Sequence, residues 1–145
     1  MRKLLPVIVL LFLFGCTTNI NKEIIGSWEI TKDTITNIKQ YLVRYKQRYN
    51  ASDSDIAAER SRVMSMTRYY PVGITFVFKD SNKFYLGGIQ GKWKLNKNKL
   101  TIKFSRIDSA SLNIRKLNKK IMVLSYTMKV DSFPLQCQIQ LERTK

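Results

Sequence analysis

The amino-acid sequence predicts a mainly β domain, an eight-stranded antiparallel up-and-down barrel, closed or half open, with two helices inserted between its first two strands. Three observations predict this fold. Apolar residues occupy every second position of eight short segments, which is typical of strands buried on one face. Turn-forming sequences separate these segments, and the links are short except for one. The exception, residues 33–70, shows apolar residues at helical spacing instead.

The predicted strands follow one another along the chain. The first is expected over 23–31, where Trp28 and Ile30 share one face, and the second over 72–79, where Phe76 and Phe78 face inward. The remaining six are expected near residues 84–86, 90–95, 100–105, 112–114, 121–130 and 135–142.

The inserted segment predicts two amphipathic helices. Asp33 or Thr34 is expected to cap the first, because a short side-chain oxygen can accept a bond from a free backbone N–H. Ser52 begins the second, where Asp55 completes a variant of the capping box, and Pro71 ends it near residue 70.

These helices carry a stripe of aromatic and methionine residues. The stripe is expected to lie across the open end of the barrel as a lid or simply to pack against the barrel. Its members are Tyr41, Tyr45, Tyr49, Met64 and Met66.

Sequential hairpins favour a barrel over the alternative, an immunoglobulin-like sandwich. Closing the sheet removes both exposed edges. The long crossings of a sandwich do not fit links of three or four residues.

The first fifteen residues are expected to be a signal peptide, because Arg2 and Lys3 precede an apolar run too short to span a bilayer. Residues 13–16, Leu-Phe-Gly-Cys, resemble a bacterial lipobox. The resemblance implies cleavage before Cys16, lipid attachment to it, and a polar tether over 16–22; the alternative is a secretory signal with a chance cysteine. Thr17 in place of aspartate favours the periplasmic face of an outer membrane.

The charge of the chain is strongly positive. Removing Arg2 and Lys3 leaves 24 basic residues against 10 acidic ones, a formal charge of +14. In an envelope protein this favours anionic lipid or another envelope protein as partner, or a solvated surface, rather than nucleic acid.

With eight strands expected, Gly26, Trp28 and Arg143 resemble the barrel-floor residues of lipocalins, and the succession around Trp93 resembles bacterial lipocalin-like lipoproteins. The resemblance covers roughly residues 23–143. It implies that Trp28 closes the barrel floor beneath the Arg143 side chain. From the residues alone, the favoured interpretation of Trp28, Trp93 and Arg143 is that they only pack the core, with the arginine over a tryptophan ring.

The sequence contains few residues that could catalyse a reaction. The chain contains no histidine, and it lacks the spacings of a nucleophile elbow, a phosphate loop or a metal-binding cysteine pair. Cys137 alternates with apolar residues as a small buried residue does. We therefore expect a protein without catalytic residues, metal or cofactor.

Two functions remain open from the sequence. The first is a membrane-anchored, lipocalin-like protein that binds a lipid or small hydrophobic molecule inside the barrel. The second is a non-catalytic module with a filled barrel that docks an envelope protein or anionic lipid. The candidate cavity residues are Phe76, Phe78, Trp93, Phe104, Tyr126 and, at the mouth, Arg106.

Overall fold

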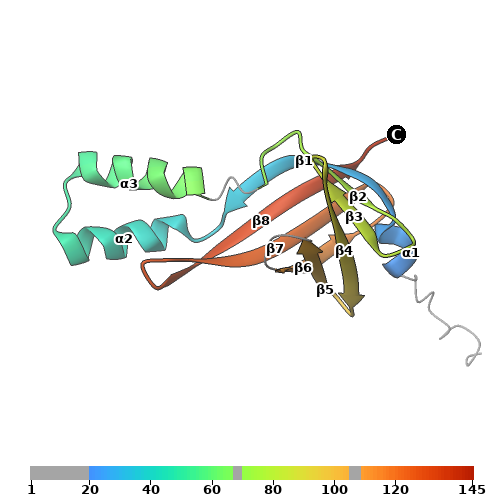
Figure 1. Ribbon diagram of the computed structural model, residues 1–145. Helices are drawn as coiled ribbons and strands as arrows, with labels where there is room; N and C mark the ends of the chain where they lie inside the picture. Colours follow the sequence, from blue (N-terminus) through green and yellow to red (C-terminus); the bar gives the residue numbers. More distant parts are fainter. Residues whose placement is uncertain (1–19, 67–69, 105–108) are drawn as a thin grey trace, which may run out of the picture.

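The computed structural model describes residues 20–66, 70–104 and 109–145 and contains a closed barrel of eight antiparallel strands with a helical arm at one end (Figure 1). Successive strands pair around the barrel, and β1 closes it by pairing with both β2 and β8. The predicted fold class is therefore confirmed. The strands are β1 (Gly26–Ile35), β2 (Thr75–Phe78), β3 (Lys83–Leu86), β4 (Ile89–Asn96), β5 (Lys99–Phe104), β6 (Ala110–Leu117), β7 (Ile121–Val130) and β8 (Phe133–Arg143).

Three helices accompany the barrel in the part of the chain that the structure describes. α1 (Ile20–Ile24) precedes β1, while α2 (Ile38–Tyr49) and α3 (Asp53–Met66) lie between β1 and β2. No helix in the described part of the chain is long and apolar enough to cross a membrane.

β1 extends past the predicted helix start, so the prediction that Asp33 or Thr34 caps a helix was wrong. Both residues pair with the long strand β8, and a register shift after Ile30 keeps the extended part of β1 in that ladder. Asn37 is the residue before α2, and its side chain bonds to β8 instead of capping the helix. Its Nδ2 donates to Pro134 O at 3.0 Å, and its Oδ1 accepts from Gln136 N at 2.8 Å. The pairing of β1 with β8 and the bonds of the Asn37 side chain to β8 therefore decide where β1 ends and α2 begins.

The second helix begins as predicted. Ser52 N donates to Asp55 Oδ2 at 2.9 Å, and Asp55 N donates to Ser52 Oγ at 3.2 Å, which is the reciprocal pair of a capping box. Asn50 ends α2 in the left-handed region, with φ 47°. The predicted end of the second helix falls partly on 67–69, outside the described residues.

Residues 20–24 are helical, where the sequence predicted a tether reaching Lys22. The Trp28 indole donates from Nε1 to the α1 carbonyl of Ile24 at 2.8 Å, and Ile24 is fully buried in the barrel core. α1 therefore lies against one end of the barrel (Figure 1).

The residues that the structure describes form two hydrophobic clusters. The barrel core contains sixteen buried residues, among them Trp28, Phe76 and Leu124. The arm core lies at the far ends of β1, β7 and β8, and it gathers buried residues of these strands and of both inserted helices. Its buried members are Ile35, Tyr41, Leu42, Val63, Val130, Leu135 and Cys137.

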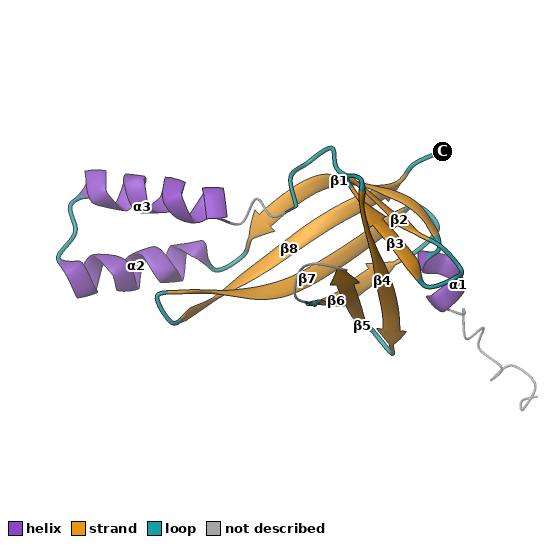
Figure 2. Ribbon diagram, in the orientation of Figure 1, coloured by secondary structure: helices purple, strands orange, loops and turns teal. Residues whose placement is uncertain are grey.

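The position of the arm contradicts the lid that the aromatic stripe suggested. Figure 2 shows β7 and β8 continuing beyond the shorter strands toward α2, with α2 and α3 beside each other away from the barrel. Tyr41 is buried in the arm core, whereas Tyr49, Met64 and Met66 are exposed. Some residues of the stripe therefore pack into the arm core and others face solvent. The reason is that the extended hairpin of β7 and β8 gives the helices a packing surface away from the barrel.

Candidate functional site

A hollow of about 460 Å³ lies between α2 and the turn that joins β7 to β8. We call it the arm groove. Its volume falls within the range of small-ligand pockets. It is lined by Tyr41, Arg44, Tyr45, Gln47, Arg48, Tyr49, Asp131, Ser132 and Phe133.

The β7–β8 turn forms one wall of the arm groove. Val130 and Phe133 pair across the hairpin, and the two residues between them, Asp131 and Ser132, have φ values of 47° and 66°. Positive φ at both central positions defines a tight hairpin turn that continues the strand twist. This geometry carries Phe133 to α2, where its ring lies 5.5 Å from that of Tyr41.

A polar network joins α2, α3 and this turn. Arg62 donates two bonds to the nearly buried carboxylate of Glu59, from Nε at 2.7 Å and from Nη2 at 2.6 Å. The Tyr41 hydroxyl donates to Glu59 and also lies 3.1 Å from Asp131 Oδ2. Arg62 Nη2 lies 3.6 Å from the same Asp131 oxygen. The network therefore fixes the position of the turn relative to both helices.

The electrostatics of this network favour an ionised Glu59. The hydrogen bonds from Arg62 lower the pKa of the Glu59 carboxyl, against the opposing effect of burial, and the bond from Tyr41 adds to them. Burial, followed by the bonds to Glu59 and Asp131, raises the pKa of the Tyr41 phenol. The charge of Asp131 is engaged by Arg62, so the acidic side chain of the arm groove is already paired.

Two arginines of the arm groove are held by aromatic rings. The Arg44 guanidinium lies 5.1 Å from the centre of the Phe133 ring, and the Arg48 guanidinium lies 5.4 Å from that of Tyr49. Within the described residues, neither arginine forms an ion pair. Their N–H groups therefore stay available to an anion.

The hollow continues around the Arg44 side chain. A second recess of about 470 Å³ shares Arg44, Gln47 and Phe133 with the arm groove and adds Lys39, Gln40 and Val43. Val43 is 56% exposed and Tyr49 is 53% exposed, so this face of α2 combines cations with uncovered apolar surface.

At the opposite end, the structure brings the predicted barrel-floor residues together. The Arg143 guanidinium lies 4.2 Å from the centre of a Trp28 ring and donates from Nη1 to Ile25 O at 2.9 Å. Gly26 has a φ of +136°, which side chains rarely adopt, and a Cβ there would also meet the end of the Arg143 side chain, so this position favours glycine. Arg143 also donates to carbonyls of Glu23 and Lys119. The arginine thus joins α1 to the barrel floor.

The predicted cavity residues line the barrel interior, and several contact one another. The ring centres of Phe76 and Phe78 are 6.1 Å apart, and those of Phe78 and Trp93 are 5.8 Å apart. Phe84 fills the space beside them, with its ring 5.4 Å from Phe76. Phe76, Phe78 and Phe84 have no exposed surface. Side chains therefore occupy this part of the interior.

Two other predicted cavity residues, Phe104 and Tyr126, are only partly buried against the barrel core. Phe104 contacts Phe84, and Tyr126 contacts Tyr70 at a ring distance of 5.7 Å. Arg106 and Cys16 lie outside the described residues.

A polar cluster that the sequence did not reveal lies between the two cores. Asp33 is directed to the side of Ile139, its partner on β8, and its Oδ1 is buried without a hydrogen-bond partner among the described residues. Burial raises the pKa of the Asp33 carboxyl, and burial also raises those of Tyr126 and Cys137 nearby. The register shift in β1 turns Asp33 to this side, and no local pattern predicts that shift.

The arm groove was also missed from the sequence. The one available signal was the pair of four-residue spacings, Arg44 with Arg48 and Tyr45 with Tyr49, which places all four along neighbouring rows of one helix. The contact between Arg44 and Phe133 joins residues far apart in the chain, so no local sequence pattern predicts it. Across residues 20–66, 70–104 and 109–145, no group of three or more potential metal-ligating side chains gathers around one point.

Comparison with known proteins yields no match to a family model, to a curated protein or to a solved structure. The barrel shape by itself identifies neither a lipocalin nor a lipoprotein.

Proposed function

We propose that this protein is a non-catalytic interaction module, held on a bacterial envelope membrane by an acylated Cys16 and presenting its helical arm to a partner. The observation that carries the proposal is the division of the molecule into a barrel filled with aromatic side chains and an arm that bears an open cationic groove. Closely packed rings in the interior allow the strands only one arrangement, so a filled barrel is a rigid scaffold.

Native mass spectrometry with organic extraction tests the filled barrel. A chain that lacks residues 1–18, and with them the acylated Cys16, is purified from a bacterial periplasm, and we expect the mass of that chain without a bound hydrophobic molecule. A stoichiometric lipid or other hydrophobe inside the protein would contradict the proposal.

That result would support a second function, a carrier of a small hydrophobic molecule. The partial exposure of Phe104 and Tyr126, which pack against the apolar barrel core, favours it. Tyr126→Ala would then lower the occupancy of the ligand, whereas Tyr85→Ala, which changes a half-buried tyrosine of β3, would not.

The membrane anchor rests on the lipobox resemblance and is tested separately. We expect Cys16→Ala to move the protein from the membrane fraction to the soluble fraction while the fold persists, because acyl chains contribute about 0.8 kcal/mol per buried methylene. Radiolabelled palmitate should enter the wild-type chain and not the variant. Unchanged membrane association of the variant would contradict the anchor without bearing on the filled barrel.

A further inference from the structure

We propose that the arm groove binds an extended acidic segment of a partner protein, with two carboxylates on alternate residues received by Arg44 and Arg48. The inference rests on the proposed interaction function and names the chemistry of its partner.

The charges of the arm groove select an anion. Arg44 and Arg48 project from one helix four residues apart, each beside a ring that limits its freedom. Asp131 is paired with Arg62, and Lys46, on the same helix, is paired with Asp53 at 2.9 Å. The two arginines are therefore the cations of the arm groove with unused N–H donors, and a planar guanidinium receives a carboxylate through two parallel bonds.

The spacing of the arginines fits an extended peptide. Residues four apart on a helix are separated by about 6 Å along its axis. Alternate side chains of an extended strand lie on the same side, about 6.6 Å apart. An acid-x-acid sequence can thus place one carboxylate at each arginine.

The walls of the arm groove suit the rest of such a segment. Tyr45 is half-buried and Tyr49 exposes apolar surface beside the arginines, while Val43 exposes apolar surface in the adjoining recess around Arg44. Burial of apolar surface against these side chains would add affinity to the charge pairing. The expected segment therefore combines acidic residues with at least one aromatic or aliphatic residue.

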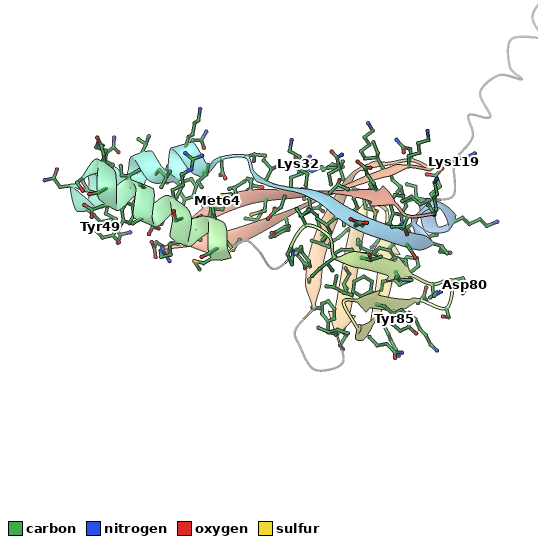
Figure 3. The ribbon with its side chains drawn as sticks, turned by 90° about the horizontal axis from the view of Figure 1, so that it is seen from above. Lys32, Tyr49, Met64, Asp80, Tyr85 and Lys119 are labelled. Atoms are coloured by element: carbon green, nitrogen blue, oxygen red, sulfur yellow. The ribbon has the colours of Figure 1, made fainter. Side chains whose placement is uncertain are left out.

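The position of the arm groove favours a protein over the lipid of the anchoring membrane. Figure 3 shows Tyr49 at the tip of the arm, with Asp80 and Lys119 at the opposite end of the molecule beside α1. Cys16 precedes Ile20, the start of α1, by four positions, and four steps along the chain span at most about 14 Å. The anchor therefore holds the end of the molecule remote from the arm groove.

Selection from a random nine-residue peptide library displayed on phage tests the inference. The full chain in non-ionic detergent is the bait, and the Arg44→Gln/Arg48→Gln variant serves for counter-selection. We expect enriched peptides to share two acidic residues separated by one position. Enrichment of neutral or basic peptides, or no enrichment, would overturn the inference and leave the filled barrel and the anchor untouched.

Fluorescence anisotropy with a labelled enriched peptide then measures the role of each arginine. We expect at least about tenfold weaker binding for each single Arg→Gln change, since a charge-assisted pair is lost. Arg44→Lys should bind between wild type and Arg44→Gln, because it keeps the charge and loses the planar donor pair. The control Lys92→Gln/Lys94→Gln removes two exposed charges from β4 and should leave binding unchanged.

Two results would contradict this reading. An equal loss in the Lys92/Lys94 control would show that general charge attracts the peptide. Displacement of the peptide by phosphatidylglycerol in mixed micelles, with the same arginine dependence, would assign the arm groove to anionic lipid instead. Circular dichroism of each variant verifies that the arm remains folded.

Discussion

Two acidic residues near the arm, Asp33 and Glu59, have pKa values shifted in opposite directions. Asp33 has a buried oxygen without a partner among the described residues, which disfavours its charge. Glu59 receives two bonds from Arg62, which favour its charge. The two carboxyl groups therefore give the stability of the protein opposite dependences on pH.

Asp33→Asn should stabilise the protein at pH 7 by about 1 kcal/mol, because it removes a poorly solvated charge. The folded pKa of Asp33 is raised, so wild type loses stability as pH rises from the unfolded value of 3.8 through the folded value. The difference between wild type and variant should vanish below pH 3.8, as urea unfolding at several pH values can measure. Asp80→Asn, at an exposed turn, is the control, and an equal effect there would contradict the explanation.

Glu59→Gln should destabilise the protein by about 1–2 kcal/mol at pH 7, since the bonds from Arg62 and Tyr41 lose their charged acceptor. The folded pKa of Glu59 is lowered, so this contribution is present above 4.5 and is lost as pH falls through the folded value. The two proteins should therefore converge in acid. Glu29→Gln, on an exposed position of β1, should not show this convergence.

At the scale of elements, α3 depends on its first turn. Only Glu59 and Val63 of this helix are buried, so few apolar contacts hold it. The reciprocal bonds between Ser52 and Asp55 satisfy backbone and side-chain groups at its start. The cap therefore matters more here than it would in a helix with a wide apolar face.

Ser52→Ala should lower the free energy of unfolding by about 1 kcal/mol and reduce the helical circular-dichroism signal. The reason is local, because the Oγ of Ser52 accepts from the N–H of Asp55. Ser111→Ala, on an exposed position of β6, is the matched control. Equal losses in both variants would contradict a capping role.

An element could be predicted from the sequence when the interactions that define it join residues close together in the chain. The capping box at Ser52 was readable, since it joins residues three positions apart. The start of α2 was not, because Asn37 bonds to Gln136, ninety-nine positions away. The helix at Ile20–Ile24 was missed for a similar reason, because its Glu23 carbonyl accepts a bond from Arg143, 120 positions away.

At the scale of the molecule, the two cores should differ in local stability. The barrel core is enclosed by a closed ladder of eight strands, while the arm core rests on the extended ends of β1, β7 and β8. Segments with fewer buried contacts open at lower free energy.

Hydrogen–deuterium exchange should therefore show faster exchange in α3 than in β4, β5 and the barrel part of β7. Glu59→Gln should accelerate exchange in α2 and α3 without changing the barrel strands. Uniform exchange across the molecule, or acceleration in the barrel, would show that the arm and the barrel unfold as one unit.

The sequence by itself determined the strands, their hairpin order and the place of the helical insertion, because alternation, turn residues and capping pairs act over a few neighbouring positions. It also suggested the barrel floor, since Gly26 and Trp28 lie together on one strand. Only the tertiary structure decided that the insertion forms an arm, that Asp33 turns inward, and that Phe133 meets Arg44. These features depend on the register of β8 against β1 and β7, which brings residues about a hundred positions apart into contact. No local pattern encodes that register, and the arm groove exists because of it.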